Sequence, residues 1–208
     1  MKGKGFTLVE MMISITLGSV LILAVTSVFS NTLTINRKSL QFSQLNEEIQ
    51  GAMTLMVRDM RRIGYWANAS TSVTDPTGNA KTFANSVDTS VVYGSEAANS
   101  CITYAYDLDD DGTLDTGTGI NNENMGFRLN ASQLEKRADG LACSAAGWTV
   151  LTDSDFSTVD ALSFSVTSNT SNNVTSRIIT ITLTMSLVQN TAITRTLVES
   201  VAVRNVDY

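Results

Sequence analysis

The sequence predicts an α+β protein in which one long N-terminal helix precedes an antiparallel, β-rich head. Two patterns carry this prediction. An apolar run near the N-terminus gives way, after Arg37, to apolar residues three and four positions apart, as on one face of a helix. Near the C-terminus, apolar and hydroxyl residues alternate, as in a strand with one buried face. The 208 residues, 43% of them hydrophobic, suit one medium-sized domain with an apolar appendage.

The first half of the helix is apolar enough to cross a membrane. No charged residue lies between Glu10 and Arg37, and a helix of that length exceeds the ~30 Å hydrocarbon core of a bilayer. Only a short basic stub with Lys2 and Lys4 precedes the run, and such a stub is expected to stay in the cytoplasm. We therefore expect a single-pass membrane protein with an extracytoplasmic head.

A secretory signal, a plain membrane anchor and a processed assembly helix are three interpretations of this segment. A secretory signal would be cut after the apolar run, where Val28-Phe29-Ser30 is a mediocre small-residue site. A plain anchor does not need Glu10, whose carboxylate is costly in a bilayer. A simpler explanation of Glu10 is that the dipole at the start of a helix favours an anion.

The stretch Lys4-Gly5-Phe6-Thr7-Leu8-Val9-Glu10, followed at once by the apolar run, resembles the type III signal of type IV prepilins. The resemblance implies that a prepilin peptidase removes residues 1–5 by cutting between Gly5 and Phe6, followed by N-methylation of Phe6. Residues 6–30 would then form the transmembrane and filament-core half of the helix. Packed neighbours could pair the Glu10 carboxylate of one subunit with the Phe6 amine of another, which relieves two buried charges.

Residues 31–66 are expected to continue the helix as an amphipathic half laid on the head. The methionines of its apolar stripe are expected to be core. Arg58, Arg61 and Arg62 suit the negative end of the helix dipole, and Gly64 is a natural residue just past the helix end. The stripe consists of Phe42, Leu45, Ile49, Met53, Met56, Met60 and Ile63.

The head, residues 67–208, is predicted to be β-rich. Its first part, to about Asn99, is rich in Ser, Thr, Asn and Gly and is expected to be mostly loop. Alternating segments on either side of a turn at 169–173 predict a hairpin. The expected strands lie at 91–93, 101–106, 162–166, 179–187 and 193–203.

Two further stretches resemble PilW-type minor pilins: the helix end from Arg58 to Trp66, and the closing Val203-Arg204-Asn205. The closing stretch also resembles, less specifically, the J-type minor pseudopilin of type II secretion. These resemblances imply a pilin fold and the function of a minor pilin, which helps to initiate a type IV pilus, or fimbrium, at or near its tip. Such pili serve motility, adhesion and DNA uptake.

The same resemblance implies partners and a location. The partners would be other minor pilins, the major pilin and a tip adhesin, in addition to the prepilin peptidase. The precursor would cross the inner membrane once with its head in the periplasm, and the mature protein would lie in the pilus on the cell surface.

Two cysteines, Cys101 and Cys143, lie in the part predicted to be exported, where oxidation is favoured. A disulfide between them would contribute about 4 kcal/mol in the chain-entropy model. A metal or catalytic role is not expected, because the chain has only two thiols and no histidine to join them.

Residues 107–115 match the first nine positions of an EF-hand-type calcium loop, with Gly112 at the sixth position. Thr118 replaces the glutamate at position twelve, so Asp110 or Glu123 would have to supply that ligand. The alternative is a solvated Asp/Gly turn after a strand. Calcium is thus the one candidate cofactor. Its predicted ligands are Asp107, Asp109, Asp111 and Asp115.

The composition argues against two other classes of function. The chain contains no histidine, and no nucleophile with an adjacent base can be named, so an enzyme is not expected. A formal net charge of −6 argues against direct nucleic acid binding. A J-type pseudopilin and an anchored surface-binding protein are the alternatives to a minor pilin. An abundant filament subunit is disfavoured by size and by the lack of a proline in the apolar segment.

Overall fold

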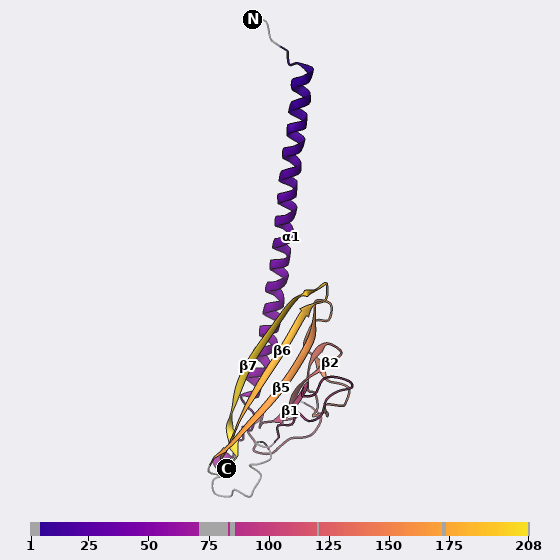
Figure 1. The fold of residues 1–208 in the computed structure, drawn as a ribbon. Helices are drawn as coiled ribbons and strands as arrows, with labels where there is room; N and C mark the ends of the chain where they lie inside the picture. Colours follow the sequence, from indigo (N-terminus) through magenta and orange to yellow (C-terminus); the bar gives the residue numbers. More distant parts are fainter. Residues whose placement is uncertain (1–4, 71–82, 84–85, 120, 172–173, 208) are drawn as a thin grey trace. The chain divides into compact units, whose positions relative to one another are not determined.

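A computed structural model of the chain describes residues 5–70, 83, 86–119, 121–171 and 174–207. It confirms the α+β class, with one long N-terminal helix, antiparallel sheets and one disulfide (Figure 1). The chain divides into two compact units, residues 1–44 and residues 45–208.

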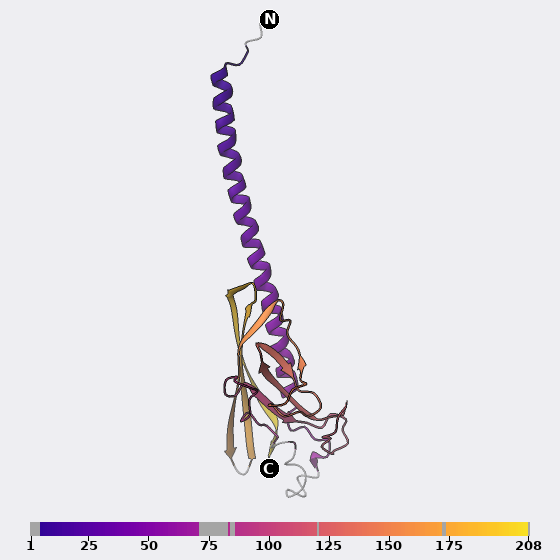
Figure 2. The ribbon, with the colours of Figure 1, turned by 90° about the vertical axis from the view of Figure 1, so that its right-hand side faces the viewer.

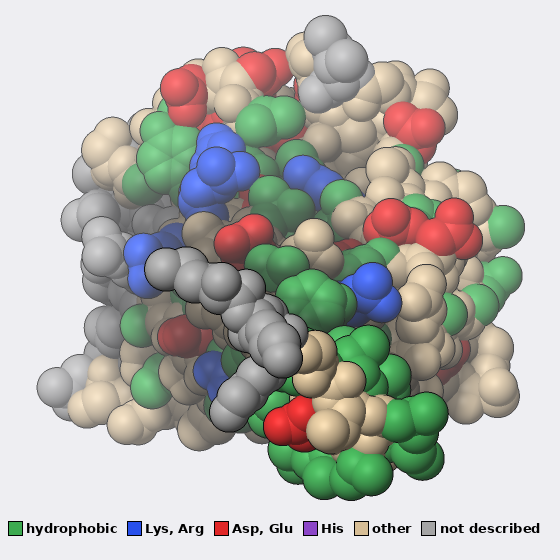
Figure 3. All heavy atoms as spheres, turned by 90° about the horizontal axis from the view of Figure 1, so that it is seen from above, with side chains coloured by type: hydrophobic (Ala, Val, Ile, Leu, Met, Phe, Trp, Pro, Cys, Tyr) green, Lys and Arg blue, Asp and Glu red, His purple; other side chains and the backbone are tan. Residues whose placement is uncertain are grey.

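The long helix, α1, spans Leu8–Met60 and therefore contributes to both units. Among the described residues it is the one helix long and apolar enough to cross a membrane. Every large apolar side chain from Leu8 to Leu40 is exposed, and in Figure 3 apolar side chains cover much of the visible circumference of the helix. A helix that is apolar all round suits lipid or other helices rather than water.

In the second unit, the last turns of α1 bury one apolar stripe. The methionines at 53, 56 and 60 are at most 3% exposed, which confirms that they are core. Phe42, predicted for the same stripe, is instead 44% exposed. The helix ends at Met60, slightly before the predicted end, and turns follow to Gly64. Gly64 adopts a φ of 71° and donates its N–H to the carbonyl oxygen of Ala105 at 3.1 Å.

Two antiparallel sheets complete the second unit, with strand orders β1-β2-β3-β4 and β5-β6-β7. Figures 1 and 2 show β5, β6 and β7 alongside the last turns of α1, and the shorter strands next to β5. The strands are β1 Cys101–Ala105, β2 Asn124–Asn130, β3 Gln133–Lys136, β4 Thr149–Val150, β5 Ser157–Ser171, β6 Val174–Leu187 and β7 Asn190–Asp207.

The alternating C-terminal pattern is confirmed as the β5–β6 hairpin and the last strand, β7. The apolar residues of β6 from Ile179 to Leu187 are buried, and its threonines line the opposite face. On that face the hydroxyls of Thr180 and Ser200, and those of Thr184 and Thr196, form hydrogen bonds of 3.0 and 2.9 Å. One face is thus apolar and buried, as the spacing predicted.

Other parts of the strand prediction were wrong or incomplete. Residues 91–93 form no strand, and the pairing near them is a bridge between Asp88 and Thr103. No strand was predicted at β2, β3 or the two-residue β4. Along β2 the apolar residues Met125, Phe127 and Leu129 alternate with glycine and polar residues, and the opposite face, which carries Arg128, is buried as well.

Side chains from α1 and from both sheets meet in one hydrophobic core, which includes a charged group, Asp59. The hydroxyls of Tyr104 and Tyr106 each donate a hydrogen bond of 2.8 Å to the Asp59 carboxylate. The Arg62 guanidinium lies 4.2 Å from the centre of the Tyr106 ring. Burial, together with the Asp59 charge, raises the pKa of both tyrosines. These contacts join the helix end to β1 and the residue that follows it.

Tyr104→Phe is expected to lower the free energy of unfolding by about 1.5–3 kcal/mol, because it removes a hydrogen bond to a buried charged group. The raised pKa of Tyr104 means that its contribution is complete below about pH 10 and is lost as the pH rises further. The difference between wild type and variant should therefore shrink above pH 10. Denaturant unfolding of the full chain in detergent measures both effects.

The matched control is Tyr93→Phe, which keeps the ring that contacts Arg128 and should change stability little. Equal stability of wild type and Tyr104→Phe at neutral pH would contradict the network around Asp59.

Candidate functional site

The segment with the prepilin-like signal is non-helical up to Thr7. Gly5, Phe6 and Thr7 precede the first helical residue and are exposed. The Gly5–Phe6 bond, where cleavage is predicted, therefore lies in accessible chain directly before the helix. Lys2 and Lys4 of the predicted leader lie outside the described residues.

Thr7 and Glu10 form a capping box at the start of α1. The backbone N–H and the hydroxyl of Thr7 both donate to Oε2 of Glu10 at 2.9 Å. The N–H of Glu10 donates in return to Oγ1 of Thr7 at 3.3 Å. This arrangement satisfies donors that the first turn of a helix leaves unpaired. This role of Thr7 was not predicted, although the Thr-x-x-Glu spacing signals it.

The capping box leaves part of the Glu10 carboxylate available. Both bonds from Thr7 end on Oε2, and Oε1 accepts no hydrogen bond within the described part of the chain. Cleavage before Phe6 would leave Thr7 and all its donors in the mature chain. Thr7 therefore orients the Glu10 carboxylate, and among the described residues nothing donates to its second oxygen.

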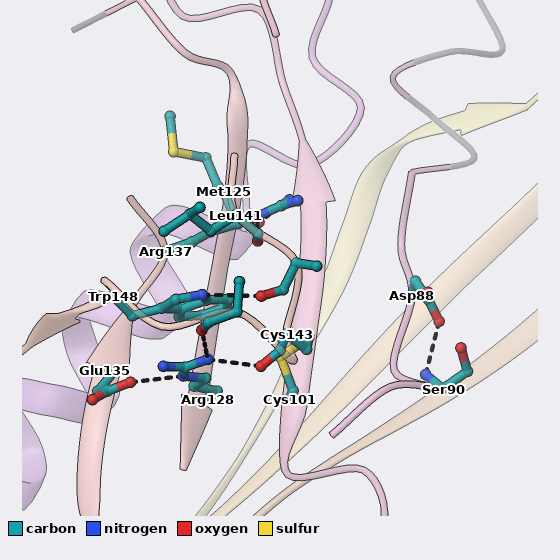
Figure 4. Close-up of a disulfide and its surroundings, with 12 residues drawn as sticks. Asp88, Ser90, Cys101, Met125, Arg128, Glu135, Arg137, Leu141, Cys143 and Trp148 are labelled. Carbon is teal, nitrogen blue, oxygen red and sulfur yellow. Dashed lines mark hydrogen bonds and ion pairs between the residues drawn. A yellow bond between two sulfur atoms is a disulfide. The ribbon is translucent and has the colours of Figure 1, made fainter. Parts of the chain in front are cut away.

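In the second unit, Cys101 and Cys143 form the predicted disulfide, with their Cα atoms 6.2 Å apart (Figure 4). Cys101 begins β1, and Cys143 lies in the turn-rich segment between β3 and β4. Both cysteines are buried, together with Trp148. The bridge ties that segment to an edge strand of the four-stranded sheet.

A buried ion pair supports the same segment. Nε of Arg128, which is 1% exposed, lies 2.6 Å from Oε2 of Glu135. The Arg128 guanidinium also donates to the carbonyl oxygens of Cys143 and Ala145, at 2.7 and 2.6 Å (Figure 4). This pair was not predicted, because Arg128 and Glu135 become neighbours only through the register of β2 and β3. The guanidinium also lies 4.1 and 4.5 Å from the ring centres of Tyr93 and Trp148.

The acidic loop follows β1 directly. One carboxylate oxygen from each of Asp107, Asp109 and Asp111 lies within 4.8 Å of the other two. In the described part of the chain this group does not include Asp115, the fourth predicted ligand. Gly112, at the sixth position, has a φ of 79°, and a Cβ there would collide with the side chain of Asn68.

Asp107 differs from its two partners because it is completely buried, whereas Asp109 and Asp111 are exposed. Its Oδ2 accepts hydrogen bonds from the backbone N–H groups of Ala67 and Gly112, each at 3.0 Å. Its Oδ1 has no hydrogen-bond partner among the described residues.

The two residues proposed as replacement ligands, Glu123 and Asp110, do not belong to this group of three carboxylates. Glu123 is buried and accepts hydrogen bonds from the backbone N–H groups of Leu108, at 2.5 Å, and Asp115, at 3.0 Å. Burial raises the pKa of Glu123. Asp110 lies at the Tyr65 hydroxyl, and this contact raises the pKa of Tyr65. Glu123 therefore holds two backbone positions of the loop in place.

Two models of known families match the chain. Residues 38–203 match the family described as Prepilin peptidase-dependent protein B, and residues 1–26 match the Prokaryotic N-terminal methylation motif. The first match includes the disulfide, the buried ion pair and the acidic loop, and the second includes the capping box. No curated protein and no solved structure matches the chain.

Replacing both cysteines by serine is expected to lower the free energy of unfolding by about 4 kcal/mol, because the bridge no longer restricts the unfolded chain. Unfolding of the full chain in detergent measures the change. Adding a reductant to the wild type is the control and should lower its stability similarly, with no effect on the serine variant. Two free thiols in the exported protein, by mass spectrometry without reductant, would refute the bridge.

Proposed function

Because this chain belongs to the prepilin peptidase-dependent protein B family, we propose that it is a minor pilin of a type IV pilus, incorporated at or near the filament tip. A pilin or pseudopilin role follows from the family and from the N-terminal methylation motif. The observation that supports assembly into a filament is the first half of α1, apolar and exposed all round, with Glu10 capped at its start.

The proposed maturation follows the order of residues along the chain. The prepilin peptidase would remove residues 1–5 by cutting between Gly5 and Phe6, and Phe6 would be methylated. Residues 6–30 would then pass from the inner membrane into the filament core. There the Glu10 carboxylate, oriented by Thr7, would receive the Phe6 ammonium group of a neighbouring subunit. Charges removed from water need such a partner, and the open Oε1 atom can accept it.

The head would work by contact rather than by catalysis. Residues 31–66 would join the core helix to the head, residues 67–208, in the periplasm and later on the cell surface. Ile178 and Val198 are exposed among hydroxyl residues on the outer face of the β5–β7 sheet. Such a face suits contacts with other minor pilins, the major pilin or a tip adhesin. In this role the protein would help to initiate pili used in motility, adhesion or DNA uptake.

Gly5→Val is expected to block removal of the leader. A Cβ at Gly5 meets open space, so the change leaves the fold intact and acts on recognition by the peptidase. The mass of the membrane-extracted protein reports whether the leader is retained. Gly51→Ala, where a Cβ also meets open space, is the control and should be processed normally. Normal processing of Gly5→Val would contradict the proposed cleavage site.

Complementation of a deletion strain is expected to separate the two roles of Glu10. Glu10→Gln can keep the capping box but carries no charge, whereas Thr7→Ala removes the cap and keeps the charge. If Glu10 pairs with the Phe6 amine, Glu10→Gln should restore few pili and Thr7→Ala many. The number of pili per cell is the measurement, with membrane levels of each variant as the control.

The opposite result, in which Glu10→Gln restores many pili and Thr7→Ala few, would mean that Glu10 serves only as a cap. Protein secretion is scored in the same strains. Normal piliation of the deletion strain together with lost secretion would overturn the pilus proposal in favour of a J-type pseudopilin of type II secretion.

A further inference from the structure

We propose that the head binds a calcium ion at the acidic loop through the carboxylates of Asp107, Asp109 and Asp111. The site belongs to the second unit, and the proposal does not depend on whether the filament is a pilus or a pseudopilus.

The buried carboxylate of Asp107 is the first reason to expect a cation. A carboxylate removed from water is costly unless a positive charge or a full set of hydrogen bonds compensates it. The N–H groups of Ala67 and Gly112 both donate to Oδ2 of Asp107, and Oδ1 has no partner among the described residues. Within that part of the chain Asp107 also forms no ion pair. The buried end of the loop therefore presents an uncompensated oxygen.

The surrounding charges strengthen this argument. Residues 107–123 carry six Asp and Glu side chains and no Lys or Arg. Such a cluster repels itself unless water or a cation intervenes. Asp109 and Asp111 are exposed, and each has an oxygen within 4.8 Å of the other two of the group. The Asn121 amide donates to Asp109 at 3.2 Å and the Thr113 N–H donates to Asp111 at 2.6 Å, so both carboxylates are oriented by the loop itself. The loop thus holds its negative charge together around Asp107.

The distances fit one ion of the size of calcium. Calcium binds oxygen at about 2.3–2.6 Å, so two ligands on opposite sides of it lie up to about 5 Å apart. The three oxygens, all within 4.8 Å of one another, can therefore share one ion. A set made only of oxygen ligands suits a hard cation, and the exposed side of the loop leaves coordination positions for water.

The loop spacing favours calcium over magnesium. The ligands occupy positions one, three and five, and Gly112 supplies the turn at position six with a φ of 79°. Magnesium demands near-ideal octahedral geometry and gives up its water reluctantly, so a loop that offers three carboxylates in sequence suits calcium better.

The contacts of the loop indicate what the ion would stabilise. The Asp107 N–H donates to the Tyr65 carbonyl oxygen at 2.9 Å, and Asp107 accepts the Ala67 N–H. Nε1 of Trp66 donates to the Gly112 carbonyl oxygen at 2.8 Å. The loop therefore holds the three residues that follow the turn at the end of α1. A calcium ion would make this junction of helix end and sheet more rigid.

The test uses the full chain in detergent, stripped of metal with a chelator and titrated with calcium chloride in a calorimeter. We expect a dissociation constant of roughly 10⁻⁴ to 10⁻³ M, as in extracellular calcium modules. Calcium should also raise the unfolding temperature, because it binds only the folded loop. Terbium, a luminescent substitute, should be sensitised by Trp66 and displaced by calcium.

Asp109→Asn combined with Asp111→Asn should weaken calcium binding at least tenfold and abolish the rise in unfolding temperature. Both residues are exposed, so the variant should fold, and circular dichroism and the intact disulfide check this. The control, Asp155→Asn with Glu199→Gln, removes the same charge from two other exposed positions and should bind like wild type.

Four results would overturn the proposal. The first is the absence of both binding heat and a thermal shift at millimolar calcium, and the second is unchanged calcium affinity of the Asp109/Asp111 variant. The third is an equal loss of calcium affinity in the control variant, and the fourth is magnesium binding as tight as calcium binding.

Discussion

The rest of this chain depends on one constraint: its single long helix must be stable in two different apolar surroundings. From Leu8 to Leu40 its large apolar side chains are exposed, so this half needs lipid or other helices. From Leu45 onward only one stripe is apolar, and it is buried in the head. Each fully buried side chain of this size contributes about 1.5–3 kcal/mol. The six residues of this kind from Leu45 to Ile63 together therefore contribute more to the free energy of unfolding than an exposed ion pair, which contributes about 0–1 kcal/mol.

The polar contacts of the head are arranged around the end of that helix, and β1 provides most of them. Tyr104 and Tyr106 reach Asp59 from β1 and from the residue after it. Asp107 then accepts a hydrogen bond from Ala67, just beyond the helix. At its other end β1 begins with Cys101, which the disulfide links to a segment that Arg128 also holds. One short strand thus connects the helix end, the acidic loop and the disulfide.

The two regions that bear on function each contain a carboxylate whose hydrogen bonds all end on one of its two oxygens. At the N-terminus, Thr7 donates to Oε2 of Glu10, and Oε1 accepts no hydrogen bond from the described residues. In the head, backbone N–H groups donate to Oδ2 of Asp107, and Oδ1 has no hydrogen-bond partner in the part of the chain that the structure describes. Each carboxylate is oriented by its own chain and keeps an oxygen for a group from outside, which is an ammonium in one proposal and a calcium ion in the other.

The sequence by itself determined the features that depend on local spacing. The helix, the hairpin of β5 and β6 and the buried stripe, apart from Phe42, follow from periodicity, because side-chain direction repeats regularly along helices and strands. The positions of Asp107, Asp109 and Asp111 in a loop follow from the same kind of local pattern, and the Thr7–Glu10 spacing could have been recognised in advance. The cysteine pairing could be predicted because the chain has only two cysteines, Cys101 and Cys143.

Tertiary structure decided whatever depends on residues that meet across strands. Both faces of β2 are buried although its large apolar residues occupy only one of them, and Arg128 and Glu135 are partners only through the register of β2 with β3. The sequence likewise could not separate Asp107 from the other loop aspartates. Its burial results from packing against the residues after the helix, and burial is what turns one of several similar carboxylates into a buried oxygen without a partner.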